Sequence, residues 1–157
     1  MPKLPVLDPA TLEPVTGTFY PAPFETATDG RSKRQLTELL GLTQFGVNIT
    51  ELAPQSASSL RHWHSHEDEF VYVLEGEVTL LSDAGEQTLG PGMCMGFPAG
   101  KPDGHCIHNK TDRPATILEV GSRNMADEGN YSDVDLHCKA GRYEKAVFTK
   151  KDGTPVG

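Results

Sequence analysis

The densest group of residues able to do chemistry lies between positions 61 and 69 of the sequence. Three of the six histidines, His62, His64 and His66, fall within five positions there, and Glu69 follows them. Imidazole nitrogens and a carboxylate form a donor set that suits first-row divalent ions such as Fe, Mn, Ni or Zn. This segment therefore indicates a site for one divalent metal ion, and a solvated polar loop is the alternative.

Strand geometry decides which of these residues can act together. Residues 58–64 are expected to form a β-strand, in which successive side chains point to opposite faces. His62 and His64 then share one face. A short loop brings Glu69 in at the start of the next strand. His66 lies within that loop, where we expect it to be exposed to solvent or to support a ligand.

A third nitrogen donor is available downstream, in a strand expected at residues 105–109. On that strand His105 shares a face with Asn109, whereas His108 lies on the opposite face. The loop before it, residues 98–104, is rich in glycine and proline and can turn the chain back over the site. Antiparallel pairing can then place His105 beside the strand that carries the first two histidines.

The elements that must position these residues are short strands. From residue 42 to residue 121 the sequence alternates between apolar and polar residues, and glycine, proline and aspartate break it at short intervals. This pattern predicts an all-β, antiparallel barrel or sandwich. Residues 1–41 are expected to form an extended arm with one or two helical turns over 31–41. Residues 122–157 are expected to form a tail that packs on the barrel or on a partner.

The first histidine segment carries a family pattern. The spacing His62-x-His64-x4-Glu69-x6-Gly76 resembles the first motif of the cupin superfamily. A second motif is approximated by Gly92-x5-Pro98-x-Gly100 followed by His105-x3-Asn109. Four residues separate Gly100 from His105, where the family usually has two, so this loop is longer by two residues.

The resemblance covers roughly residues 42–121 and is to small, single-domain cupins. It implies a jelly-roll barrel with one metal ion bound by His62, His64, Glu69 and His105. Water or substrate would fill the remaining positions. Glycines 76 and 92 would be turn residues with positive φ, a conformation that costs glycine little.

Bulk properties exclude several classes of partner. The net charge of −8 and a pI of about 5.1 disfavour nucleic acid, because no long basic run offsets them. No apolar stretch approaches the roughly 18 residues of a membrane span, and no signal peptide is evident. Three cysteines without regular spacing suggest a reducing, cytoplasmic location. Cys94, between two methionines, is expected to be a buried small hydrophobe.

An apolar stripe predicts a homodimer. Phe70, Tyr72 and Leu74 alternate with Val71 and Val73, so they should lie on the outer face of the same strand. Such a face can pair with a second copy of the chain, and a covering tail is the alternative.

Three functions remain open for a small-molecule substrate. The first is a metal-dependent sugar or sugar-phosphate isomerase or epimerase, for which Arg61 or Lys101 can offer a positive charge to an anion. The second is a non-haem iron dioxygenase, with Val71, Val73 and Met95 in an apolar pocket wall. The third is a non-catalytic binding module. Glu67 is expected to be a charge at the rim, and orientation of an imidazole is the alternative.

Overall fold

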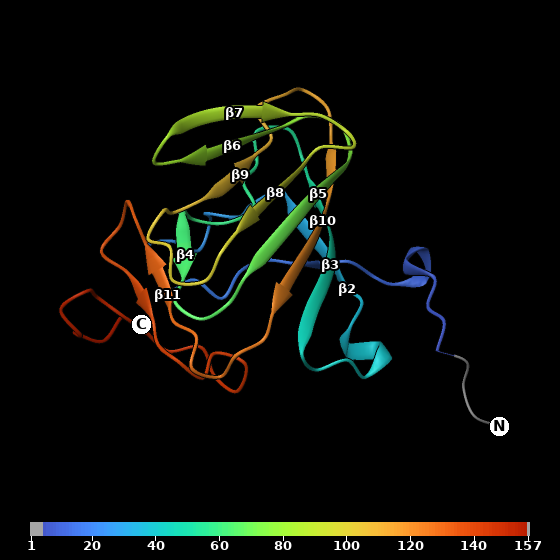
Figure 1. Cartoon of the computed structure of the whole chain (residues 1–157). Coiled ribbons are helices and arrows are strands. Elements are labelled where there is room, and N and C mark those ends of the chain that lie inside the picture. Colours follow the sequence, from blue (N-terminus) through green and yellow to red (C-terminus); the bar gives the residue numbers. More distant parts are fainter. Residues whose placement is uncertain (1–4, 157) are drawn as a thin grey trace.

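The computed structural model describes residues 5–156, and nearly all of its regular structure is antiparallel β-strand (Figure 1). The largest sheet has six strands, in the spatial order β1 (Val15–Thr16), β2 (Arg31–Gln35), β3 (Phe45–Leu52), β10 (Ala115–Ser122), β5 (Glu69–Glu75) and β8 (Cys94–Phe97). Two short 3-10 helices, η1 (Pro9–Thr11) and η2 (Glu38–Leu40), lie outside it. The predicted all-β, antiparallel jelly-roll class is confirmed. The described residues include no helix long and apolar enough to span a membrane.

Two smaller sheets complete the fold. One has the order β7 (Gly85–Leu89), β6 (Val78–Ser82) and β9 (Cys106–His108). The other has the order β13 (Phe148–Thr149), β12 (His137–Cys138), β11 (Gly129–Tyr131) and β4 (His62–His64). Figure 1 shows β4 and β11 side by side, so the end of the chain lies against the strand that carries the first two histidines.

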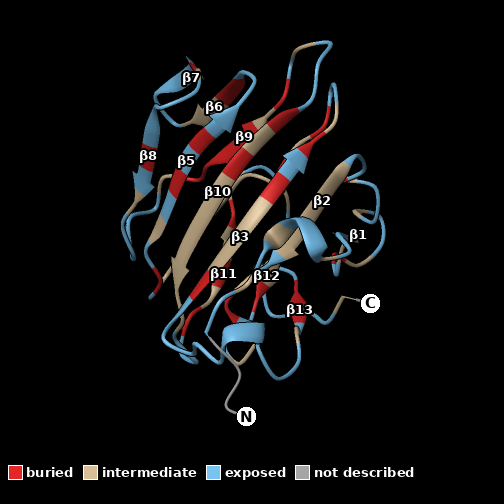
Figure 2. Ribbon diagram, turned by 90° about the vertical axis from the view of Figure 1, so that its right-hand side faces the viewer, coloured by how far each residue is buried: buried red, intermediate tan, exposed pale blue. Residues whose placement is uncertain are grey.

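The apolar core lies between the large sheet and the three-stranded sheet. Strand β5 shows the alternation most clearly: Val71 and Val73 are buried, whereas Phe70, Tyr72 and Leu74 are 42%, 37% and 39% exposed (Figure 2). The apolar stripe predicted for the outer face is therefore present on the surface of this chain.

The expectation that Cys94 is buried is wrong. It lies on β8 opposite Tyr72 and is exposed, whereas the next residue, Met95, is buried opposite Val71. The alternation of the strand assigns the inward position to the methionine, which fills the core in place of the smaller thiol.

One row of the large sheet leaves space on its inner face. Gly46 of β3 pairs with Gly121 of β10, which in turn pairs with Glu69 of β5. Directly paired residues point to the same face of a sheet. The two glycines therefore leave the inner surface beside Glu69 without side chains of their own.

The neighbouring rows are polar, which is unusual for the inside of a barrel of this size. Gln35, Asn48 and Glu119 form one row, and Lys33 with Thr50 belongs to the next. We call these five residues the polar wall. Such a wall lowers the stability that burial can supply, and it marks a surface that faces a polar ligand or water.

The segment 31–41 differs from its expectation. It begins as a strand, β2, and contains only the single turn η2. The strand pairs along five residues of β3 and thereby satisfies the backbone groups of that edge. The residues on both sides of residues 42–121 add strands to the sheets, and a domain division at residues 41 and 121 stays a prediction.

The glycine turns follow the expected chemistry. Gly76 has φ of 75° and Gly92 has φ of 88°. At Gly76 a Cβ atom would lie 2.6 Å from the carbonyl oxygen of Pro114, so the position has no space for a side chain. The turn between β5 and β6 depends on this residue.

Candidate metal centre

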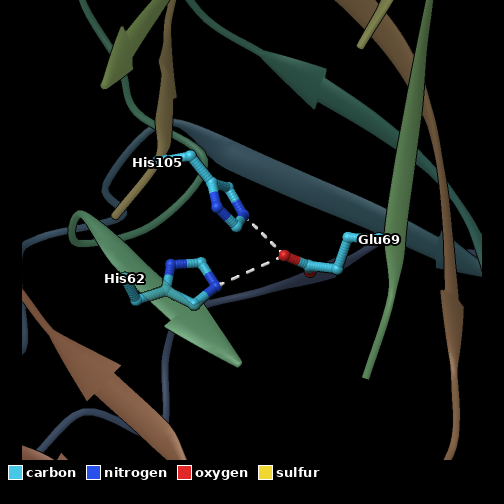
Figure 3. Close-up of side chains that lie close together, drawn as sticks. All are labelled: His62, Glu69 and His105. Carbon is cyan, nitrogen blue, oxygen red and sulfur yellow. Dashed lines mark hydrogen bonds and ion pairs between the residues drawn. The ribbon is translucent and has the colours of Figure 1, made fainter. Parts of the chain in front are cut away.

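Three separate elements bring the four predicted ligands together. His62 and His64 lie on β4, Glu69 begins β5, and His105 lies just before β9. Figure 3 shows His62, Glu69 and His105 pointing toward one another. His105 and His62 form an isolated antiparallel bridge, with N–O distances of 2.8 and 3.1 Å between their backbones. Because of this bridge, His105 lies opposite His62 of the first motif although the loop before it is longer by two residues.

The side chains converge on one oxygen atom. Glu69 Oε2 lies 2.5 Å from His105 Nε2, 3.5 Å from His64 Nε2 and 3.7 Å from His62 Nε2. The Nε2 atoms of His62 and His64 are 3.2 Å apart. Two ligand atoms that are each about 2.1 Å from an ion and at right angles lie about 3 Å from each other. His62, Glu69 and His105 therefore lie close enough together to hold one ion, and His64 borders them through its contacts with His62 and Glu69.

The hydrogen bonds behind the rings fix the tautomers. His62 Nδ1 donates to the carbonyl of Leu60 at 2.8 Å, and His64 Nδ1 donates to Asp127 Oδ2 at 2.7 Å. Both acceptors carry no hydrogen, so each Nδ1 holds a proton, and Nε2 is the nitrogen that can bind an ion once it carries no proton of its own. This donor set fits a divalent transition metal.

Charge in the cluster is unevenly held. Burial lowers the pKa of His62 to about 3, so this imidazole is neutral at pH 7. Burial also acts to lower the pKa of His64, but hydrogen bonds with Asp127 and Glu69 outweigh it and raise the pKa to about 9. Burial would raise the pKa of Glu69, yet hydrogen bonds to His105 and His64 hold it well below its usual range. A bound cation would therefore balance the negative charge of the ionised Glu69.

The remaining histidines lie outside the cluster. His105 is buried and its ring stacks on Phe97, with centroids 3.6 Å apart. His108 belongs to β9 and lies outside the cluster. His66 is exposed, and its ring forms a hydrogen bond with Ser65. The structure places His105, and not His108, beside the other three residues. Metal binding by this set stays a prediction.

Residues of the C-terminal segment support the centre, and sequence reasoning missed them. Asp127, Arg142 and Tyr143 form with Glu67 what we call the clasp. Arg142 makes ion pairs with both carboxylates, and Asp127 in turn holds His64. Glu67 is 3% exposed and bonded within the clasp, so its expected place at the rim is wrong. No motif in the sequence signals these contacts.

The clasp is not a second metal site. His64, Glu67 and Asp127 lie close enough to hold an ion, but the guanidinium of Arg142 already bonds to both carboxylates. Its positive charge occupies the place that a metal would take. The group instead positions His64 from behind.

Three of the predicted ligands, His62, Glu69 and His105, form one side of a cavity of about 500 Å³, whereas His64 lines a smaller cavity. The glycine pair and the polar wall, apart from the buried Thr50, form another side of the large cavity. A smaller cavity of about 160 Å³ lies beside Phe97 and includes Lys101. Polar and charged groups therefore surround the open side of the centre.

Arg61 does not provide a free positive charge at this cavity. Its guanidinium pairs with Asp83 at 2.8 Å and with Asp133 at 3.1 Å, outside both cavities. The cations that line the large cavity are instead Arg31, Lys33, Arg123 and Arg142.

The comparison with known proteins identifies the family. The sequence pattern of the cupin domain matches residues 48–121. A Silicibacter pomeroyi DSS-3 protein, described as a sugar phosphate isomerase from a cupin superfamily, is 46% identical, with 98% of this chain and 97% of that chain covered and a TM-score of 0.93. The chain belongs to the cupin superfamily.

Two further structures extend this relation. A proposed sugar phosphate isomerase from Acidithiobacillus ferrooxidans is 25% identical, with 81% and 80% of the two chains covered and a TM-score of 0.72. The polyketide cyclase RemF from Streptomyces resistomycificus is 23% identical over 78% and 80%, with a TM-score of 0.63, and shows a shared fold alone. No protein with a curated description matches the sequence.

Proposed function

We propose that this cupin is a metal-dependent sugar-phosphate isomerase. The observation that carries the proposal is the convergence of three Nε2 atoms on Glu69 Oε2 at the side of a polar cavity. The similarity to the Silicibacter protein supports the substrate class. A divalent ion held by His62, His64, Glu69 and His105 would polarise a sugar carbonyl and stabilise negative charge on the adjacent oxygens.

The proposed isomerisation also needs a group that moves a proton between neighbouring carbons. Glu119 fits this role, because it points into the cavity and lies one row from Glu69 on the adjacent strand. Its Oε2 accepts hydrogen bonds from Lys33 Nζ at 2.8 Å and from Thr50 Oγ1 at 2.7 Å. These bonds fix the carboxylate and leave Oε1 to accept a proton from one carbon and return it to the next.

The polar wall separates this function from the alternatives. A dioxygenase acting on an apolar substrate would need an apolar wall facing the ion. Met95 and Val73 are packed in the core, and Val71, which lines the cavity, lies beside the carboxylate of Glu119. A binding module would have no use for a fixed carboxylate beside the proposed ligands. The interior of this barrel therefore favours proton transfer on an oxygen-rich molecule.

The test is isomerisation in deuterated water. Protein loaded with Mn, Fe(II), Ni or Zn is incubated with aldose phosphates of three to six carbons, and ketose formation and deuterium incorporation are followed by NMR. Glu119→Gln should lower kcat by about 100-fold or more and keep the metal content of the wild type. Glu51→Gln, on the outer face of β3, is the matched control.

Two results would contradict the proposal. Oxygen uptake without isomerisation would indicate the dioxygenase. Saturable binding of sugar phosphates without turnover or deuterium exchange, with every metal tested, would indicate a binding module.

A further inference from the structure

Arg31 occupies an unusual position on the inner face of β2. It pairs in register with the buried Leu52 and lines the large cavity. Its Nη1 donates to the carbonyl of Ser58 at 2.6 Å, and its Nη2 donates to the carbonyl of Gly17 at 2.9 Å. These two bonds aim the guanidinium and use two of its five N–H groups.

No carboxylate of residues 5–156 forms an ion pair with Arg31. Four other arginines, Arg34, Arg61, Arg123 and Arg142, each pair with at least one carboxylate, and Arg113 is exposed to solvent. Burial lowers the pKa of Arg31, and the charge of Glu119 opposes this effect. A guanidinium nevertheless stays protonated at neutral pH.

A partly buried positive charge without a counter-charge is costly unless a ligand supplies one. This protein has a net charge of −8, so acidic groups are abundant, yet none within residues 5–156 pairs with this side chain. The free N–H groups form a planar fork that matches the geometry of a phosphate, which can accept two parallel hydrogen bonds.

The position of Arg31 relates it directly to the candidate metal centre. The carbonyl that it contacts belongs to Ser58, and the next residue, Ser59, places its hydroxyl 3.3 Å from His62 Nδ1. Lys33 lies two positions further along the same face of β2 and donates a hydrogen bond to Glu119. The segment Ser58–Ser59 thus connects Arg31 to His62. Strand β2 connects Arg31, through Lys33, to the proposed base Glu119.

We propose that Arg31 anchors a phosphate subsite, which holds the phosphate group of the substrate while the other end of the molecule reaches the metal centre. This inference rests on the proposed function, because it names how the same cavity recognises its substrate. The polar wall, whose rows lie between those of Arg31 and Glu69 in the sheet, would then face the polar groups of the sugar.

Binding of inorganic phosphate tests the subsite without any need for turnover. The dissociation constant is measured by calorimetry for wild type and for Arg31→Gln, Arg31→Lys and Arg34→Gln, each with metal and after chelation. Arg31→Gln should weaken phosphate binding about 10- to 100-fold, as expected for loss of a charge-assisted pair. Arg31→Lys should fall between that variant and the wild type.

Arg34→Gln is the matched control, because Arg34 lies on the same strand and pairs with Glu51 on the outer face. It should bind phosphate as the wild type does. Thermal unfolding of every unliganded variant checks that the fold is kept, and Arg31→Lys keeps the test valid if the glutamine variant does not fold.

Three results would overturn the subsite. Phosphate affinity that is equal in Arg31→Gln and Arg34→Gln would remove Arg31 from it. Phosphate binding that is lost on chelation and is unchanged in Arg31→Gln would show that phosphate binds directly to the metal ion. Acetate binding as tightly as phosphate would show a carboxylate site.

The two proposals can fail separately. Arg31-dependent phosphate binding without isomerisation would refute the isomerase and keep the subsite. Isomerisation with a KM that Arg31→Gln leaves unchanged would keep the isomerase and refute the subsite.

Discussion

The three imidazoles around Glu69 are each held by a different kind of neighbour. A backbone carbonyl fixes His62, a carboxylate fixes His64, and the ring of Phe97 stacks on His105. The nitrogen atoms are thus oriented by contacts outside the cluster and need no ion to bring them together. Such preorganisation favours tight binding, because little side-chain freedom is lost when the ion arrives.

The ligand assignment predicts a sharp difference among neighbouring histidines. His62→Ala and His64→Ala should each remove most of the bound metal, because both rings point at Glu69. His66→Ala should leave it largely intact, because that ring is exposed and bonded to Ser65. Metal per chain is measured by mass spectrometry. Equal loss in all three variants would show that the strand register is wrong.

Asp127 predicts an effect on affinity from outside the ligand set. Asp127→Ala removes the acceptor that orients His64, and it should weaken metal binding about 10- to 100-fold. A competition titration with a chelator gives this ratio. Asp112→Ala, an exposed residue of the same type, is the control and should bind as the wild type does. If Asp127→Ala binds the metal as tightly as the wild type does, the hydrogen bond between Asp127 and His64 has no effect on metal affinity.

At this scale the sequence predicted the cluster but not its support. Alternation along one strand is enough to put His62 and His64 on one face, and the spacing to Glu69 is local. Asp127 reaches His64 only because the C-terminal segment returns to pair with β4. That path depends on tertiary packing, which residue spacing does not encode.

Among the elements, one short strand has the largest role. Strand β4 has three residues, pairs with β11 on one side and meets His105 on the other. A strand this short cannot hold its own position, so its geometry depends on these neighbours. The clasp adds ion pairs between the loop after β4 and the C-terminal segment.

The clasp predicts a stability effect. Arg142→Met leaves Glu67 and Asp127 buried without their cation, and it should lower the free energy of unfolding by about 3–5 kcal/mol. Urea unfolding measures the change. Adding Glu67→Gln to that variant should restore part of the loss, because one buried charge is then absent. Lys145→Met, an exposed residue nearby, should change stability little. A similar small effect in Arg142→Met would mean that water replaces the guanidinium.

Strand β2 shows where pattern reading fails for an element. Its sequence, Arg-Ser-Lys-Arg-Gln, has no apolar alternation, since one face meets the polar cavity and the other meets solvent. Such a strand looks like a loop or a helical turn when hydrophobicity is the signal. The strands with one face in the core, such as β5 and β10, follow the alternation and were predicted.

Across the whole molecule, charge is distributed unevenly. The chain has a net charge of −8, yet the walls of the large cavity carry four cations, Arg31, Lys33, Arg123 and Arg142, against three carboxylates, Glu67, Glu69 and Glu119. A metal ion would add further positive charge. Lys33, Arg123 and Arg142 pair with Glu119, Glu38 and Glu67, so Arg31 and a bound metal ion would supply the positive charge that attracts an anionic substrate to the cavity.

The exposed outer face of the large sheet carries the prediction of a homodimer. Tyr72 and Leu74 lie there with Phe70, and no segment of residues 5–156 buries them. We expect sedimentation at micromolar concentration to give a species of twice the chain mass of 17.0 kDa. Tyr72→Glu should shift it to the monomer, because a charge would be buried at the contact.

Thr88→Glu, on the exposed strand β7, is the control for that substitution and should leave the association unchanged. A wild-type protein that sediments as a monomer would refute the dimer and leave the stripe as a surface for another partner.

The clasp has a consequence for how the protein matures. A ribosome makes the chain from its N-terminus, so His62, His64, Glu69 and His105 all exist before Arg142 is added. Until then Glu67 and Asp127 have no cation, although β11, the strand beside β4, has already been made. The nascent chain at that stage carries every proposed ligand without the ion pairs of the clasp. Capture of the proposed metal ion in its final geometry would therefore follow the addition of Arg142.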